Sequence, residues 1–282
     1  MNIKPLLFIF FLLPILAKAQ SPWTPGKGKQ YSQVSYTTVP SYNQLFLDNG
    51  SLELDRFRTD NTIQAYTECG IGNKFALIGV VPLKMIKVGE KTDEQSVSTL
   101  EEQTAVNLGD AQLGLKYNFL QKGKWAFGAS LLTSFPTSNE VEIGLRSGFD
   151  EFHVRPSLSA GISDETYYGY GFISYNWFND RIDPSIYWGI EFGFKIVPSF
   201  IIAAEISSIR NLKELDPNPQ NVGSGLFLNG FEYTAVLVKF IKEFVPDKFG
   251  MLFSFGGGQG NLVAQSPALT LGAYLKVDWN KE

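Results

Sequence analysis

The sequence is poor in cysteine and histidine, and each shortage excludes a class of protein. Cys69 is the only cysteine, so no intrachain disulfide can form and a disulfide-stabilised secreted fold is excluded. His153 is the only histidine, so a metal site built from several histidines is excluded as well. We therefore expect neither a metal site nor any other cofactor.

Long apolar runs are confined to the N-terminus. Residues 1–19 contain an apolar run from Pro5 to Leu16, followed by Ala17-Lys18-Ala19, which has the small-x-small pattern of a cleavage site. The run is shorter than the roughly 20 residues that a membrane-spanning helix needs, and Pro14 interrupts it. We expect a cleaved signal peptide over 1–19 and one domain over 20–282. The alternative is a retained N-terminal anchor helix.

Positive charge is also scarce. The chain has 24 basic and 28 acidic residues, and the leader contains two of the lysines, so the exported form keeps 22 against 28, a net charge of −6. A nucleic-acid-binding surface would be basic and clustered, so we expect no nucleic-acid partner. No later segment resembles a helical membrane span, because none approaches 18 uninterrupted apolar residues. An exported chain of this kind is either a secreted β-protein or a membrane β-barrel.

Aromatic residues and period-two alternation are abundant. In Pro184–Ile196, large apolar residues occupy one face, and Gly, Glu and Lys dominate the other. Gly109–Phe119 repeats this pattern, which suits lipid outside and a polar lumen inside. Ten further segments follow it with varying clarity: Lys29–Thr38, Asp60–Gly70, Lys74–Met85, Lys124–Ser134, Val154–Ser163, Thr166–Trp177, Ser199–Asn211, Leu226–Phe240, Lys248–Gly257 and Pro267–Trp279. The sequence predicts about twelve antiparallel strands.

The predicted connections alternate between short and long. The short ones are Ile71–Asn73, Gln121–Gly123, Asp164-Glu165, Val197-Pro198 and the somewhat longer Ile241–Asp247. The others are mostly long: Val39–Thr59, Ile86–Leu108, Phe135–His153, Phe178–Asp183, Leu212–Gly225 and Gly258–Ser266. Bacterial outer-membrane barrels have short periplasmic turns and long extracellular loops. We therefore expect an all-β transmembrane antiparallel β-barrel with both termini periplasmic. A soluble β-sandwich is the alternative, since alternation alone does not distinguish a core from lipid.

Aromatic residues cluster at both ends of the predicted strands. Those beside the short turns are Phe75, Phe119, Trp125, Phe200, Phe240, Phe249 and Trp279, and those near the opposite ends are Phe135, Trp177, Tyr187 and Trp188. Two aromatic belts are typical of a protein that crosses two membrane interfaces.

Four segments of the sequence carry a family resemblance. They are Trp23–Gly28, Glu68–Phe75 leading to Pro82, Gly109–Tyr117 and Phe135–Thr137. In these segments, the chain resembles the outer-membrane barrels grouped as phenol-degradation meta-pathway proteins. The resemblance covers mostly the first half of the chain and rests on strand ends, tight turns and glycines. It implies a barrel and a transport role, and it identifies no substrate.

Charged residues opposite the apolar positions are expected to face the lumen. A lysine on the lipid face near the bilayer midplane would cost about 2–4 kcal/mol, which favours the inward orientation. The lumen candidates are Lys116, Glu191, Lys195, Glu205, Glu232 and Lys276. Two interpretations stay open: a hydrated path for solutes, or cross-strand salt bridges that fill a narrow interior.

Catalytic motifs are nearly absent. Ser157 lies four residues after His153, and in a strand the two would be about 13 Å apart on one face, too far for a hydrogen bond. A serine on a neighbouring strand stays open as a partner of His153. We expect no enzyme activity, with a lipid-modifying outer-membrane enzyme as the third hypothesis.

The leading hypothesis is a passive outer-membrane channel or transporter for small solutes, with membrane lipids and lipopolysaccharide around it. The second is a non-conducting surface barrel whose long loops, especially Ile86–Leu108, bind a partner or envelope component.

Overall fold

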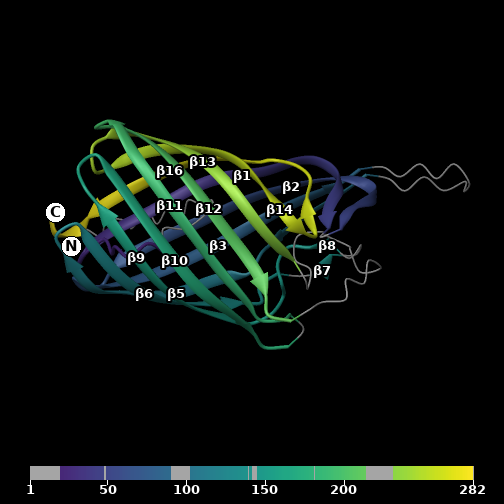
Figure 1. Cartoon of the computed structure of the whole chain (residues 1–282), viewed down its shortest axis with the longest axis horizontal. Coiled ribbons are helices and arrows are strands. Elements are labelled where there is room, and N and C mark those ends of the chain that lie inside the picture. The colour runs from purple at the N-terminus through teal and green to yellow at the C-terminus, as the bar shows by residue number, and fades with distance from the viewer. Residues whose placement is uncertain are drawn as a thin grey trace, which may run out of the picture.

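The computed structural model describes residues 20–47, 49–89, 102–138, 140–141, 145–180, 182–213 and 231–281. Twelve strands form one closed antiparallel sheet (Figure 1). They are β1 (Lys29–Leu47), β2 (Gly50–Gly70), β3 (Phe75–Val88), β5 (Ala111–Lys122), β6 (Trp125–Phe135), β9 (His153–Ser163), β10 (Tyr167–Phe178), β11 (Ser185–Val197), β12 (Phe200–Asn211), β13 (Glu232–Val245), β14 (Phe249–Asn261) and β16 (Ala268–Asp278).

Closure of the sheet occurs at β1, which pairs with β2 on one side and with β16 on the other. Ser35 lies opposite Gln64 in the first pairing and opposite Gly272 in the second. Because neither edge of the sheet is left unpaired, the fold is a barrel and not a sandwich. The predicted all-β barrel of about twelve antiparallel strands is confirmed.

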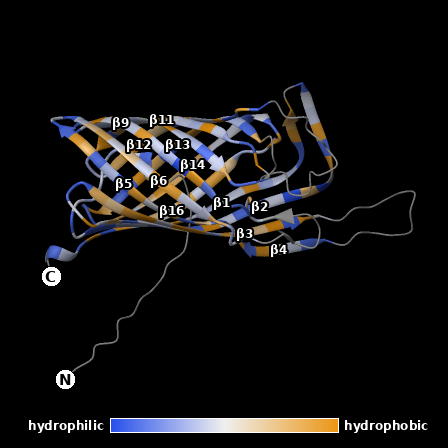
Figure 2. Cartoon of the chain, turned by 90° about the horizontal axis from the view of Figure 1, so that it is seen from below, coloured by the Kyte–Doolittle hydropathy of each residue, from blue (hydrophilic) through white to orange (hydrophobic). Residues whose placement is uncertain are grey.

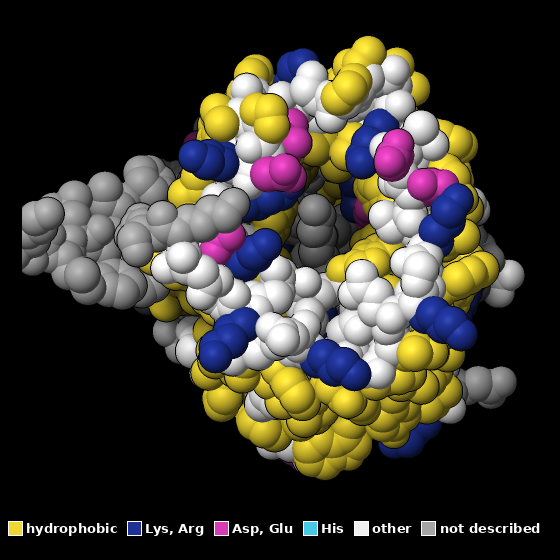
Figure 3. Space-filling model, turned by 90° about the vertical axis from the view of Figure 1, so that its left-hand side faces the viewer, with side chains coloured by type: hydrophobic (Ala, Val, Ile, Leu, Met, Phe, Trp, Pro, Cys, Tyr) yellow, Lys and Arg dark blue, Asp and Glu magenta, His cyan; other side chains and the backbone are white. Residues whose placement is uncertain are grey.

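The wall of the barrel alternates between two environments. Along β11, Tyr187 and Glu191 are buried, whereas Trp188, Ile190 and Phe192 are exposed. Figure 2 shows hydrophobic and hydrophilic residues alternating along the strands, and Figure 3 shows apolar side chains over much of the outside. The outer surface is therefore apolar and the interior largely polar, the reverse of a water-soluble protein.

Among the described residues, no helix is long and apolar enough to cross a membrane.

The connections define two ends of the barrel, which we call the short-turn end and the long-loop end. At the short-turn end, β5 and β6 are joined through Gly123, whose φ is 58°, and β13 and β14 through a turn containing Asp247, whose φ is 54°. The start of β1 and the end of β16 meet there, where the Trp279 amide donates to the Gly28 carbonyl at 2.8 Å. Figure 3 views this end and shows a hollow rimmed by charged side chains.

The predicted first long loop, Val39–Thr59, is wrong. β1 and β2 continue through it as a hairpin that projects from the long-loop end (Figure 2). Pro40 lies at a register shift between Val39 and Tyr42, as expected of a residue that cannot donate a ladder hydrogen bond. The hairpin packs against the segment that follows β14 around a small core of five buried residues: Tyr42, Leu45, Leu54, Leu262 and Ala264.

Further strand segments differ from the prediction. The join Ile86–Leu108 contains β4 (Gln103–Leu108), which pairs with β3, while residues 90–101 lie outside the described part. The predicted start of the tenth strand at Leu226 also lies outside it, and β13 extends through most of the expected join to Val245. The remaining elements are short: β7 (Glu140–Val141), β8 (Leu145–Arg146), β15 (Val263–Ala264) and the 3-10 helix η3 (Trp279–Lys281).

The aromatic positions follow the two predicted belts with one exception. Phe75, Trp125 and Trp279 are exposed near the short-turn end, and Trp177 is exposed toward the other end. Tyr187 was wrongly assigned to a belt: it is only 5% exposed, because it lies on the interior side of β11, one position from the outward Trp188.

Candidate functional site

The interior of the barrel has a packed half near the short-turn end and a more open half near the long loops. The packed half contains residues Ser21–Pro25, which we call the N-terminal strap. Asn118 Nδ2 donates to the Pro22 carbonyl at 2.8 Å, and Trp23 meets Tyr170 edge to face at 6.2 Å. Since Asn118 and Tyr170 are buried interior residues, the strap lies within the lumen.

Glycines make room for the strap. A Cβ on Gly161 would lie 2.6 Å from the Trp23 ring, and a Cβ on Gly128 would lie 3.0 Å from the Pro22 Cα. Side chains at these two wall positions would displace the strap.

Lys116 on β5 joins the strap to the barrel wall. Its side chain is completely buried, and its Nζ donates to Glu68 Oε2 at 2.9 Å and to the Trp23 carbonyl at 3.3 Å. Tyr66 donates to the same Glu68 oxygen at 2.8 Å. A buried lysine requires such compensation, because an unpaired charge in this setting is strongly destabilising.

A second charged cluster lies on β11, β12 and β13. Lys239 Nζ donates to Glu191 Oε2 at 2.6 Å and also contacts Glu205 Oε2, and all three side chains are buried. Tyr168 adds a hydrogen bond to Glu191 Oε1 at 2.7 Å. Two carboxylates and one ammonium give this cluster a formal charge of −1.

Tyrosines fill the space between the charged clusters. Tyr31 stacks on Tyr274 at 5.5 Å and meets Tyr66 at 6.1 Å, and all three are buried. The cavity beside Tyr31, Tyr170 and Lys239 measures about 40 Å³, enough for little more than a water molecule. The described side chains therefore leave little free space at this point of the packed half.

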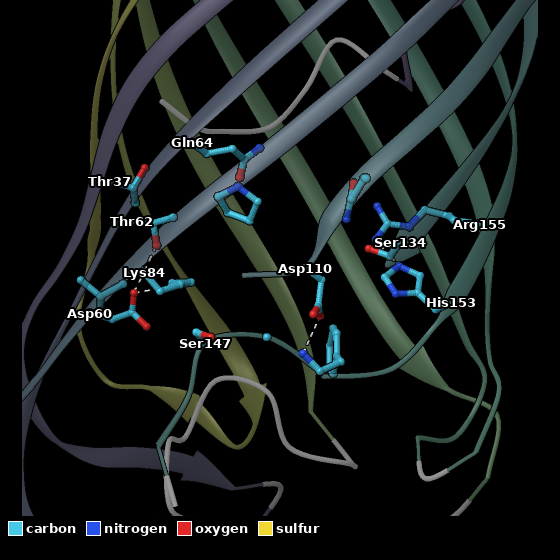
Figure 4. A pocket seen from close by; sticks show the side chains of 15 residues that line it. Thr37, Asp60, Thr62, Gln64, Lys84, Asp110, Ser134, Ser147, His153 and Arg155 are labelled. Carbon is cyan, nitrogen blue, oxygen red and sulfur yellow. Dashed lines mark hydrogen bonds and ion pairs between the residues drawn. The ribbon is translucent and has the colours of Figure 1, made fainter. Parts of the chain in front are cut away.

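The long-loop half contains a larger cavity of about 300 Å³ (Figure 4). One wall comes from β1, β2 and β3 and presents Asp60, Thr62 and Lys84. The opposite wall comes from β6 and β9 and presents Ser134, His153 and Arg155. Lys84 Nζ donates to Asp60 Oδ1 at 2.9 Å, so the first wall has an internal ion pair.

A loop after β8 forms part of the floor of this cavity in Figure 4. Asp110 holds the loop in place through two hydrogen bonds. Its Oδ2 accepts one from the Phe149 amide at 2.7 Å, and its Oδ1 accepts the other from Ser138 Oγ at 2.5 Å. A Cβ on Gly148 would lie 2.6 Å from Asp110 Oδ2, so this close approach requires glycine.

The six predicted lumen residues occupy different surroundings. Lys116, Glu191 and Glu205 lie in the buried clusters just described. Lys276 is half-buried near the short-turn end and pairs with Glu243 at 2.8 Å. Lys195 is exposed at that same end.

Glu232 differs from its expected orientation. It pairs with the exposed Arg210 at 3.2 Å at the long-loop end, on the same side of β13 as the outward Val236. The alternation places Leu237 and Lys239 inward, so the interior positions of β13 are the odd-numbered ones.

Several interior charges were not identified from the sequence. Lys239 lies one residue before the end of the predicted strand Leu226–Phe240, which also contains Glu232. The alternation would have placed Lys239 inside if the odd-numbered positions had been assigned to the interior. Asp60 and Lys84 lie in predicted strands whose polar positions follow no clean alternation. Arg155 lies two residues after His153 in β9, and it lacks a pattern of apolar neighbours that would predict which face of the strand it occupies.

The catalytic hypothesis for His153 gains no support from the geometry. Ser157 donates to Ser174 at 2.8 Å, and Ser134, directly across from His153, makes no hydrogen bond with it. Within the described residues, His153 has no serine hydrogen-bonded to it, and no group of three metal-ligating side chains occurs.

The fold is shared with solved outer-membrane barrels. The chain superposes on an outer membrane channel from Pseudomonas putida F1 with a TM-score of 0.67 and 14% identity over 91% of this chain and 98% of that one. The translocator domain of the autotransporter NalP from Neisseria meningitidis gives 0.50 and 10% identity over 89% and 90%. The Pseudomonas putida toluene transporter TodX gives 0.44 and 11% identity over 90% and 91%. No protein-family model and no curated protein sequence matches the chain.

Proposed function

We propose that this protein is a passive outer-membrane channel for small solutes and that the N-terminal strap closes it in the present conformation. The observation that carries the proposal is a charged, partly hollow interior inside a barrel with an apolar outer wall. Such an interior suits solute passage and not lipid contact. The fold shared with the Pseudomonas putida channel supports the same function.

The proposal includes a location and an orientation. Residues 1–19 are a signal peptide, the short-turn end faces the periplasm, and the long-loop end faces the exterior. The apolar wall contacts outer-membrane lipids, with lipopolysaccharide in the outer leaflet. The resemblance to the phenol-degradation meta-pathway group supports transport without indicating a solute.

The second candidate is a barrel that never conducts. The packing of Tyr31 against Tyr66 and Tyr274 in the interior favours it, because small barrels can be filled by their own side chains. The two candidates differ in what happens when the strap is removed: a permanent core would lose stability, whereas a plug would leave an intact, permeable barrel.

Proteoliposome swelling tests the proposal. Vesicles containing the wild type, or a variant lacking Ser21–Pro25, are diluted into glycerol, arabinose and a disaccharide. We expect the variant to admit glycerol faster than the wild type and to discriminate by solute size. Lys213→Gln, at an exposed position outside the lumen, is the control. Swelling of the folded variant no faster than that of empty vesicles would refute a channel.

A further inference from the structure

The wall of the large cavity formed by β6 and β9 contains a cation without a carboxylate partner. Arg155 Nε donates to Asn176 Oδ1 at 2.8 Å, and its guanidinium lies 5.7 Å from the centre of the Tyr187 ring. Among the described residues, none of the ion pairs within 4.0 Å includes Arg155. The guanidinium therefore has donor capacity that these contacts do not use.

Two buried side chains beside Arg155 also have unused hydrogen-bonding atoms. Ser134 and His153, which face each other across β6 and β9, are 1% and 3% exposed, and Ser134 Oγ and His153 Nδ1 have no hydrogen-bond partner in the part of the chain that the structure describes. His153 Nε2 lies 3.5 Å from Arg155 Nη2. With Nε2 accepting from the guanidinium, the neutral ring carries its hydrogen on Nδ1. This wall thus offers donors from three adjacent residues (Figure 4).

The opposite wall offers an acceptor. Asp60 is buried, and its Oδ1 accepts from Lys84 at 2.9 Å and Thr62 at 3.3 Å. No described residue forms a hydrogen bond with its Oδ2. The other carboxylate of the cavity, Asp110, uses both oxygens to hold the loop. Lys84 is compensated by Asp60. Among the described residues that line this cavity, Arg155 is then the cation without a carboxylate beside it.

We infer that this cavity is a binding subsite for a small organic carboxylate that carries a hydroxyl group at its far end. The carboxylate binds Arg155, aided by Ser134 and His153, because a guanidinium matches the planar arrangement of two carboxylate oxygens. The distant hydroxyl donates to Asp60. The volume of about 300 Å³ is at the small end of the range for ligand pockets. The inference rests on the proposed function, since it names the class of solute that the channel selects.

Calorimetric titration of the full chain in detergent tests this site with three probes of equal length. They are 6-hydroxyhexanoate, hexanoate without the hydroxyl, and 1,6-hexanediol without the carboxylate. We expect the hydroxyacid to bind most tightly and the diol least tightly. Arg155→Gln should weaken both carboxylates by about tenfold or more and leave the diol unchanged.

Two more variants separate the roles of the walls. Arg155→Lys keeps the charge but loses the planar geometry, and is expected to bind with intermediate affinity. Asp60→Asn should reduce the preference for the hydroxyacid over hexanoate. Lys213→Gln removes an exposed cation, 68% accessible in its side chain, and should change none of the affinities. Heat-modifiable migration on gels verifies that each barrel is folded. The comparison of the three probes on the wild type tests the site even if a variant does not fold.

The outcomes distinguish the subsite from the channel. Equal binding of hydroxyacid and diol by the wild type, or equal hydroxyacid affinity of folded wild type and Arg155→Gln, overturns the subsite. Glycerol entry in the swelling assay without Arg155-dependent binding overturns the subsite and leaves the channel. Arg155-dependent binding in a barrel that admits no solute supports the subsite and overturns the channel.

Discussion

Lys116 illustrates how a single residue couples the wall of the barrel to its contents. Its ammonium is completely buried between Glu68 and the carbonyl of Trp23, far from the water that would solvate it. Desolvation of both charges is costly, so the pair stabilises the barrel only while both partners and their hydrogen bonds remain. If one partner is removed, the other is left as a buried charge without compensation, which destabilises the barrel.

Lys116→Met is expected to lower the free energy of unfolding by about 3 kcal/mol, because Glu68 is left as a buried, unpaired carboxylate. Adding Glu68→Gln should recover part of the loss by removing that charge. Urea titrations of folding into lipid vesicles measure both effects, with Lys213→Gln as the matched control. An unchanged unfolding midpoint for Lys116→Met would contradict the role given to this ion pair.

The ion pair between Lys124 and Asp164 predicts a pH dependence at the short-turn end. The hydrogen bond from Lys124 is the main contribution that lowers the pKa of Asp164 below its usual 3.8. A lowered carboxyl pKa contributes stability above the unfolded-state value, and this contribution is lost as the pH falls through the folded-state value. Thermal unfolding of wild type and Lys124→Gln should therefore differ slightly at pH 7, and the difference should shrink as the pH falls below 3.8 toward the folded-state value. A gap that persists at the lower pH would contradict this assignment.

At the scale of elements, the twelve strands were predictable because period-two alternation extends over most of each membrane-facing segment. The β1–β2 hairpin was not, since Pro40 breaks the register and the polar residues beyond it read as a loop. Tyr187 lies near a strand end, which suggests an aromatic belt, but the alternation along β11 places it on the interior face. The cavity itself depends on pairings such as Ser134 with His153, which join segments that no local sequence pattern connects.

The loop held by Asp110 predicts a local change in dynamics. Asp110→Ala removes the acceptor for the Phe149 amide and for Ser138. Hydrogen exchange of a peptide spanning 145–152 should then become at least about tenfold faster, because a hydrogen bond to a charged group contributes roughly 1.5–3 kcal/mol. A peptide from β11 serves as the internal control and should be unaffected. Equal exchange in both proteins would show that Asp110 does not hold the loop.

At the scale of the whole molecule, the barrel is apolar on the outside and largely polar on the inside, the reverse of a water-soluble protein. Apolar side chains cover the outer wall, so charge and hydrogen-bonding groups gather in the lumen. The interior must then either pair these groups with one another or leave room for water and solute. The short-turn half of this barrel does the first, and the long-loop half provides the room.

The orientation of the wall can be tested by placing one charge at two depths. Ile190 is 57% exposed near the middle of β11, and Ile196 is exposed near its short-turn end. In a bilayer, Ile190→Arg should cost about 2–4 kcal/mol of folding free energy and Ile196→Arg about 0–1. Equal costs in urea titrations of folding into vesicles would contradict a membrane-embedded wall.

Single-channel recording in planar bilayers reports the opening of the lumen itself and so tests whether the strap closes a channel. The wild type is compared with the variant lacking Ser21–Pro25, each verified as folded by heat-modifiable migration. We expect rare or small openings for the wild type and larger, long-lived conductance steps for the variant. A folded variant whose current stays at the baseline would show that the lumen is not a channel and that the strap does not close one.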